Sequence, residues 1–183
     1  MQGNALEDLG EANIVAVGHT NGFVKGIGGV STLMHHYGRD AVPLGSYKGP
    51  WARNATAGRA CRVGIDAPHC HPCAAGSSGP QCAGGASSDH YLSDLLGRFP
   101  SGVRDSTQVP TAVATYRKAL AAAQNHSVAI ASIGITTNMR DLVLSERDEF
   151  SPLSGPELIG QKVKLIVWMD GGYNFVRACL ALF

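Results

Sequence analysis

Charged side chains are scarce in this sequence of 183 residues, at 16% against about 25% in ordinary soluble domains. The formal net charge is only +1, and no stretch carries a block of like charge. Nucleic acids and anionic membrane surfaces attract proteins through clustered basic residues, so the sequence predicts neither as a partner. No apolar run approaches the ~20 residues that cross a bilayer, so we expect no membrane span.

The N-terminal segment lacks a basic stretch followed by an apolar one, so no secretory signal is visible. The glycosylation sequons at Asn54 and Asn125 lack that secretory context and are interpreted as chance matches. We therefore expect a cytoplasmic protein, and the chain is long enough for one domain with a substantial core.

The sequence also lacks two motifs, one typical of serine hydrolases and one typical of nucleoside triphosphatases. The sequence contains neither a G-x-S-x-G nucleophile elbow nor a Walker-type phosphate loop. The segment 26–29 (GIGG) begins like a dinucleotide fingerprint, but Ser31 replaces the final glycine of that pattern. We expect these glycines to allow close helix packing instead.

Alternation between short apolar runs and helical stripes predicts an α/β protein. Continuous apolar runs between helices are typical of parallel strands that are buried on both faces. The fold class we predict is an open, mostly parallel sheet with helices on both faces. The predicted strands are residues 13–17, 41–44, 127–133 and 163–169, and the predicted helices are 27–37, 89–99, 109–123, 138–144 and 156–162.

Three loops follow predicted strands, at residues 18–22, 133–138 and 169–174, and each contains an asparagine. Ligands of open parallel sheets bind beyond the carboxyl ends of the strands, so these loops are candidate ligand contacts. Simpler interpretations stay open: a turn at Asn21, a strand–helix junction capped by Thr136 or Thr137, and a glycine-rich turn with a solvated Asp170.

Residues 57–87 form a segment rich in Cys and Gly without sustained periodicity, which we interpret as an insertion. Thiolates and imidazoles are preferred zinc ligands, but only one close-spaced Cys pair is present. A zinc site and a disulfide-bonded loop are therefore weaker alternatives to an incidental insertion. The residues concerned are Cys61, His69, Cys70, His71, Cys73 and Cys82.

Several segments together resemble the inosine–uridine preferring nucleoside hydrolase family, and in particular its uncharacterised eukaryotic branch. They are VAVGHTNGF, HHYGRDAVPLGSYKG, SSDHYLSDLLGRFPS, IASIGITTNMRDLV, SPLSGPELIGQKVKLIVWM and YNF. The resemblance covers most of 1–56 and 88–176, leaving 177–183 as a divergent tail. It implies a Rossmann-like α/β sheet, hydrolysis of the N-glycosidic bond of ribonucleosides, and a bound calcium ion.

The resemblance also implies roles for particular residues. Asn21 and Asn174 would contact the ribose of the substrate, and the backbone carbonyl of Ile133 would bind calcium. Asp170 has no firm counterpart in the family. The sequence departs from the family in lacking the N-terminal acidic cluster, the last calcium aspartate and the leaving-group histidine, and neither Glu7 nor Asp8 substitutes for them.

These departures leave no residue assigned to catalysis. Without its anionic ligands, calcium should not bind tightly. The alternatives to an active hydrolase are a catalytically dead protein that binds a nucleoside or ribose, and a zinc-binding interaction protein. A homo-oligomer is possible on either interpretation. Because the family's first strand is missing, we also expect an exposed strand edge, an exposed apolar face and poor solubility.

Overall fold

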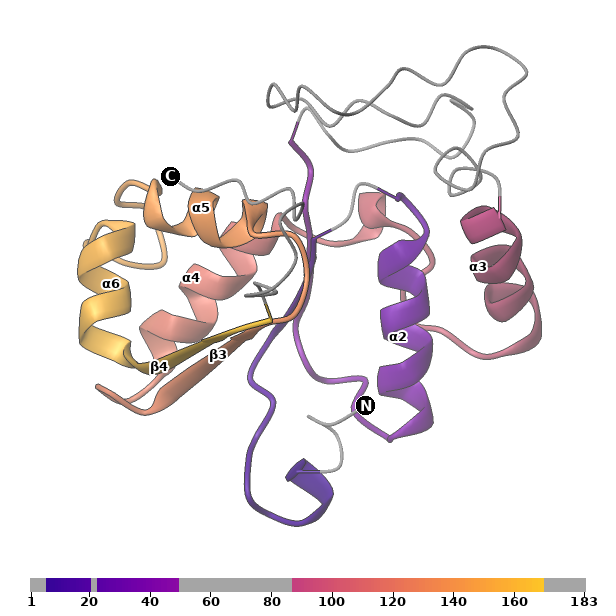
Figure 1. Ribbon diagram of the computed structural model, residues 1–183, viewed down its shortest axis with the longest axis horizontal. Helices are drawn as coiled ribbons and strands as arrows, with labels where there is room; N and C mark the ends of the chain where they lie inside the picture. Colours follow the sequence, from indigo (N-terminus) through magenta and orange to yellow (C-terminus); the bar gives the residue numbers. More distant parts are fainter. Residues whose placement is uncertain (1–5, 21–22, 50–86, 170–183) are drawn as a thin grey trace, which may run out of the picture.

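The computed structural model describes residues 6–20, 23–49 and 87–169, which fold as a mixed α/β protein with short parallel strands (Figure 1). The strands are β1 (Val17–His19), β2 (Leu44–Ser46), β3 (Val128–Ser132) and β4 (Val163–Trp168). The helices are α2 (Gly26–His36), α3 (Ser87–Arg98), η2 (Ser106–Gln108), α4 (Ala112–Ala122), α5 (Thr137–Val143) and α6 (Gly155–Lys162).

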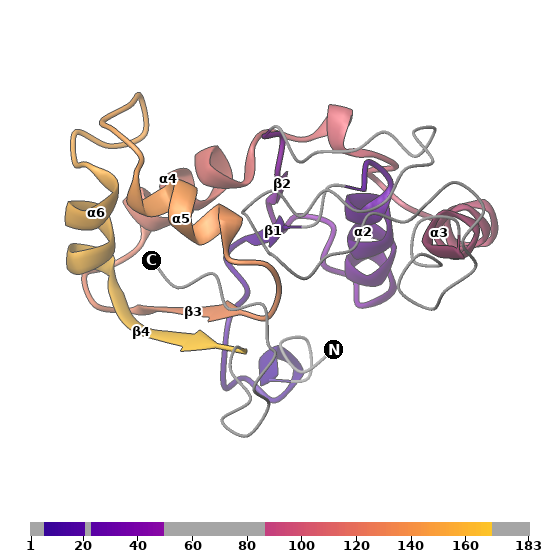
Figure 2. The same ribbon diagram turned by 45° about the horizontal axis from the view of Figure 1, so that its top comes forward.

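The four strands form two parallel pairs rather than the single sheet expected from the sequence. β1 pairs with β2, and β3 pairs with β4 (Figure 2). Both pairs lie against α4, which contacts β1 and β2 directly and contributes Leu120 to the core beneath β3 and β4. The described residues thus retain the parallel pairing and the helical cover of an α/β fold, without a backbone ladder that joins the two pairs.

The first pair is short for a local reason. Apolar residues predicted a strand at 13–17, but the ladder begins at Val17 and ends at His19. On the partner strand, Pro43 has no backbone N–H to donate, and β2 starts only after it. The carbonyl of Pro43 still accepts a hydrogen bond from Val17 N at 3.0 Å, which sets the register of the pair.

Glycines on α2 let α3 and the loop after it approach closely. A Cβ atom on Gly28 would lie 2.4 Å from the carbonyl oxygen of Arg104, and one on Gly29 would lie 3.0 Å from Leu92 Cδ2. The interpretation of this glycine run as a packing feature is confirmed. The helical spacing of Ile27, Leu33, Met34 and Tyr37 predicts one buried face for this helix. Ile27 and Met34 are buried, but Leu33 and Tyr37 are exposed, and Ser31 and Thr32 are buried instead.

The main core lies between β3–β4 and the helices α4, α5 and α6, which Figure 1 shows on one side of these strands. Its buried centre consists of Leu120, Met139, Leu142 and Leu158. Strand residues Ile130 and Ile166 pack against this centre from below. Burial of such side chains is the principal source of stability in a domain of this size.

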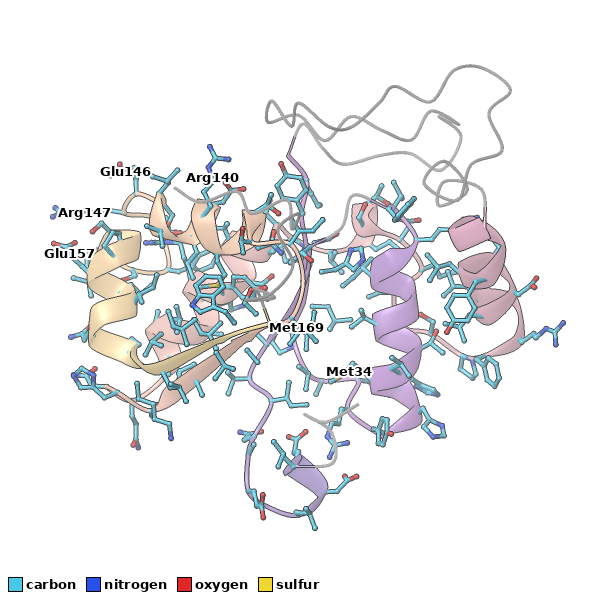
Figure 3. The ribbon with its side chains drawn as sticks, viewed as in Figure 1. Met34, Arg140, Glu146, Arg147, Glu157 and Met169 are labelled. Atoms are coloured by element: carbon cyan, nitrogen blue, oxygen red, sulfur yellow. The ribbon has the colours of Figure 1, made fainter. Side chains whose placement is uncertain are left out.

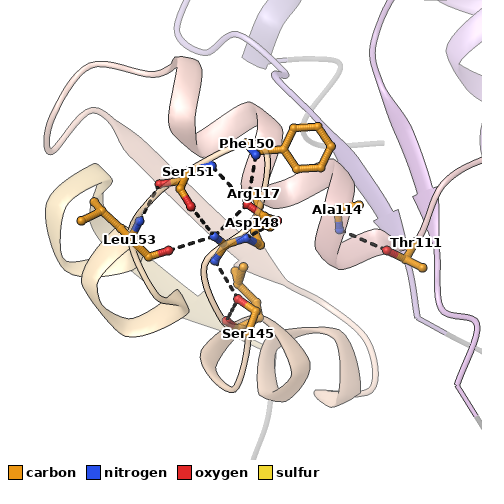
Figure 4. A network of polar contacts seen from close by, with 9 residues as sticks. Thr111, Ala114, Arg117, Ser145, Asp148, Phe150, Ser151 and Leu153 are labelled. Atoms are coloured by element: carbon orange, nitrogen blue, oxygen red, sulfur yellow. Dashed lines mark hydrogen bonds and ion pairs between the residues drawn. The ribbon is translucent and has the colours of Figure 1, made fainter.

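A buried arginine ties the loop between α5 and α6 to α4 (Figure 4). Arg117 is 1% exposed, and its Nε and Nη2 atoms donate to the two carboxylate oxygens of Asp148 at 2.6 and 2.9 Å. It also donates to Ser145 Oγ and to the carbonyl oxygens of Ser151 and Leu153. The hydrogen bonds from Arg117 hold the pKa of Asp148 below its ordinary value.

None of the helices in the described ranges has the length and apolar character needed to cross a membrane.

Candidate functional site

The carboxyl ends of β1 and β3 meet through a buried side chain. Asn138, on α5 just after β3, is 1% exposed, and its Nδ2 donates to the carbonyl oxygen of His19 at 3.1 Å. The same carbonyl accepts a hydrogen bond from Tyr47 N at 2.9 Å. Two of the three predicted strand-exit loops are therefore joined, as expected for a parallel α/β arrangement.

A tyrosine from α4 lies beneath this junction. A Cβ atom on Gly18 would be 1.9 Å from Tyr116 Oη, so only glycine fits at this point of β1. Tyr116 forms a hydrogen bond with Asn138, and burial raises the pKa of its phenol. The phenol therefore stays protonated and neutral across the physiological range.

Two buried polar atoms at these strand exits have no hydrogen-bond partner within the part of the chain that the structure describes. They are Nδ1 of His19 and Oγ1 of Thr137. More than 90% of buried polar groups in native proteins are paired, so an unpaired one calls for a specific explanation. Burial lowers the pKa of His19, so its ring is neutral at pH 7 and presents one donor and one acceptor nitrogen.

The second exit loop lies against the first. A Cβ atom on Gly134 would be 2.6 Å from Thr20 Oγ1, so the two loops are in close contact. Ile133, the residue predicted to offer a carbonyl to calcium, leads into this contact and has a side chain that is 71% exposed. Thr136 is the N-cap of α5 as expected for one of the two threonines, but its side chain makes no capping hydrogen bond.

Several predicted residues lie outside the described ranges. They are the two substrate-binding candidates Asn21 and Asn174, the nearby Asp170, and the candidate zinc ligands in 57–87. Their assignments remain predictions.

The donors that do meet at the strand exits are imidazole, phenol, amide and hydroxyl groups, none of them anionic. Calcium prefers six to eight oxygen ligands with carboxylates among them. Within the described residues, no group of three or more His, Cys, Asp or Glu side chains is placed to hold a metal ion. This donor set does not fit calcium, and the role of the Ile133 carbonyl remains a prediction.

Sequence reasoning did not identify His19, Tyr116 or Asn138 as site residues. The helical spacing of Val113, Tyr116 and Leu120 within 109–123 predicts that Tyr116 faces inward, but spacing does not identify the partner of its hydroxyl. The hydroxyl of a buried tyrosine usually has a hydrogen-bond partner, so an inward-facing Tyr116 indicates a polar group nearby. The position of Asn138 within an exit loop was a second such signal.

Together the fold and the site define a mixed α/β protein in which neutral polar side chains meet at the carboxyl ends of parallel strands. No family model, no curated protein and no solved structure matches this chain.

Proposed function

We propose that this chain is a nucleoside-hydrolase-like protein that binds the ribose of a ribonucleoside at the joined exits of β1 and β3. The observation that carries the proposal is the pair of buried, unpaired polar atoms, Nδ1 of His19 and Oγ1 of Thr137. A sugar hydroxyl both donates and accepts a hydrogen bond. It therefore suits a neutral imidazole and a threonine hydroxyl equally well.

The resemblance to nucleoside hydrolases supports the choice of a ribonucleoside as the ligand. In that family two asparagines hold the ribose, and Asn21 and Asn174 match their positions. Asn21 follows the exit of β1 by two residues, next to His19 and Thr20. We extend the proposal to a Rossmann-like arrangement of the two strand pairs and to a cytoplasmic location.

The groups that meet at this junction, an imidazole, a phenol, an amide and a hydroxyl, can bind and orient a sugar. Activation of water for hydrolysis calls for a general base such as a carboxylate, and none of these four groups is one. Binding is therefore the function that their chemistry supports most directly. Hydrolysis of the N-glycosidic bond is the activity that the resemblance adds. An active hydrolase releases the free base from a nucleoside, whereas a binding protein does not, so an assay for the released base distinguishes the two.

Calorimetric titration with ribose, inosine and uridine tests the proposal. We expect all three to bind, and we expect the free bases hypoxanthine and uracil not to bind, because the sugar makes the contacts. The proposal would be overturned if ribose, inosine and uridine all failed to bind, or if the free bases bound as tightly as the nucleosides. Base release measured with and without added calcium then distinguishes an enzyme from a binding protein.

Replacement of Thr137 by Val removes the unpaired hydroxyl while preserving the shape of the side chain. Loss of one hydrogen bond to the ligand costs about 1 kcal/mol, so ribose affinity should fall ~5-fold. Thr136→Val is the matched control, because the neighbouring side chain makes no capping hydrogen bond. Equal affinities of the two variants would place the ribose elsewhere.

A further inference from the structure

Asn138 connects α5 with β1 and α4 at the proposed site. Its side chain is 1% exposed, donates from Nδ2 to the carbonyl oxygen of His19, and forms a hydrogen bond with Tyr116. Arg140, two residues further along α5, lies about 200° away around the helix axis. Its side chain is 54% exposed and points outward (Figure 3). The first turn of α5 therefore directs an amide, and not a cation, toward β1.

Both unpaired polar atoms of the site belong to residues that Asn138 holds in place. Thr137 precedes it directly on α5. His19 is held through its carbonyl oxygen, which accepts hydrogen bonds from Asn138 Nδ2 at 3.1 Å and from Tyr47 N at 2.9 Å. A carbonyl oxygen has two lone pairs, so these two donors fix the backbone at the end of β1 from two sides.

The start of α5 has no side-chain cap to fix it. Thr136, its N-cap residue, makes no capping hydrogen bond, whereas Thr111 at the start of α4 accepts one from Ala114 N. A side-chain cap satisfies a free N–H group and stabilises the first turn of a helix. At α5 the hydrogen bond from Asn138 to β1 is the side-chain contact that fixes the first turn, and with it the direction of the Thr137 hydroxyl.

We infer that Asn138 is a positioning residue, which aligns the imidazole of His19 and the hydroxyl of Thr137 for a sugar. Tyr116 is its orienting partner, because bonds to two elements fix the plane of the buried amide. The inference rests on the proposed function and adds that ribose affinity depends on a side chain that acts through its neighbours. Asn138 is buried and already bonded, so it holds the two contacting groups rather than the ligand.

A double-mutant cycle of ribose affinity, measured by calorimetry on the full chain, tests this role. Asn138→Asp keeps the size of the side chain but replaces the donor to His19 by an acceptor. Both contacting groups should then be misaligned, and at ~5-fold for each lost contact, ribose affinity should fall about 25-fold. In this background Thr137→Val should weaken ribose binding less than about 2-fold, because the hydroxyl no longer contacts the sugar.

The cycle separates positioning from general stability. Thr111→Ala is the control, because it removes the cap of α4 and lowers stability at a distance from the strand exits. It should leave ribose affinity unchanged and should preserve the ~5-fold effect of Thr137→Val. The inference would be overturned if Thr137→Val kept its full effect beside Asn138→Asp, or if Asn138→Asp bound ribose as tightly as the unmodified chain.

Should Asn138→Asp fail to fold, Tyr116→Phe removes one orienting hydrogen bond and keeps the ring that lies against Gly18. Ribose affinity should fall about 2–5-fold, and an unchanged affinity would contradict the role of Asn138. Failure of ribose to bind the unmodified chain would reject the proposed function and this inference together. Ribose binding that is insensitive to both Asn138 and Tyr116 would reject this inference alone.

Discussion

Gly18 shows how one residue without a side chain allows the site to assemble. Tyr116 Oη lies 1.9 Å from the position that a Cβ atom would occupy, and the ring carbon Cζ lies 2.3 Å from it. The phenol can reach Asn138 only because β1 leaves this space empty. The contact therefore joins α4, β1 and α5 at a single point.

We predict that Gly18→Ala destabilises the fold by about 1–3 kcal/mol, because the ring must move and its hydrogen bond must break. Urea unfolding followed by circular dichroism measures the change. Gly160→Ala is the control, since nothing lies within 4 Å of its Cβ position. In a helix that change should be neutral or stabilising by about 0.5–1 kcal/mol, and a Gly18→Ala variant as stable as this control would contradict the packing.

His19 predicts a pH dependence of stability. Its folded pKa is lowered from the ordinary value of 6.5 by burial, so the unfolded state takes up a proton that the folded state resists. Stability should be intact above the unfolded pKa and should fall as the pH drops from 6.5 through the lowered folded value. Urea titrations from about pH 7 to pH 5 measure this loss.

The control for this pH effect is His19→Phe, which should flatten the dependence over that interval because the titrating group is gone. A slope that is the same in the variant would assign the effect to another group.

The ion pair between Arg117 and Asp148 gives a further prediction about stability. Asp148→Asn leaves the buried guanidinium without its anion, and removal of one partner of a buried pair costs about 3–5 kcal/mol. Asp148 is 31% exposed at its side chain, so we expect the lower end of that range. Thermal unfolding at pH 7 gives the difference.

The pH dependence that Asp148 predicts has the same direction as that of His19, but it lies at lower pH, because the ordinary pKa of the carboxyl is 3.8 rather than 6.5. The folded pKa of Asp148 is lowered, so its contribution is present above the unfolded pKa and is lost as the pH falls through the folded value. The stabilities of the variant and the unmodified chain should converge in acid. A constant gap down to the acid limit would show that the ion pair does not carry the effect.

At the scale of elements, the N-termini of α4 and α5 differ in whether the side chain of the N-cap residue makes a capping hydrogen bond. Thr111 is the N-cap of α4, and its Oγ1 accepts a hydrogen bond from Ala114 N at 3.2 Å (Figure 4). Thr136 occupies the same position on α5 without such a bond. The two helices therefore offer a matched pair for measuring one cap.

We predict that Thr111→Ala lowers the free energy of unfolding by about 1 kcal/mol, because Ala114 N loses its acceptor. Thr136→Ala should cost less, since no capping bond is lost. Chemical unfolding of both variants gives the comparison, and a larger loss for Thr136→Ala would reverse the assignment of the caps.

The elements themselves were largely predictable from local patterns. The stripe at 27–37 became Gly26–His36, and the apolar run at 127–133 became Val128–Ser132. Periodicity could place them because it reflects local packing. It could not predict the pairing of the strands, since β1 and β2 form only three ladder positions and register depends on contacts distant in sequence.

The sequence indicated where the candidate site lies, at the strand exits, but not which residues form it. The sequence predicted the exit loops of β1 and β3 as candidate ligand contacts, and the hydrogen bond from Asn138 to His19 shows that these two loops lie together. Which atoms would stay unpaired could not be predicted, because satisfaction of a buried hydroxyl depends on every neighbour in space. The role of Tyr116 likewise required knowledge of how α4 crosses β1.

At the scale of the whole molecule, the polar junction beyond β1 and β3 is the surface on which the proposed function rests. Elsewhere on the described strands, Leu165 and Val167 of β4 are 53% and 52% exposed. The poor solubility expected from the sequence remains a prediction.

The proposed ligand class is tested most directly by titration of the full chain with ribose beside a free nucleobase. We predict that ribose binds and that hypoxanthine does not. We also predict that Thr137→Val weakens ribose binding about 5-fold, while Thr136→Val leaves it unchanged. Binding of the base without the sugar, or no binding of either, would contradict it.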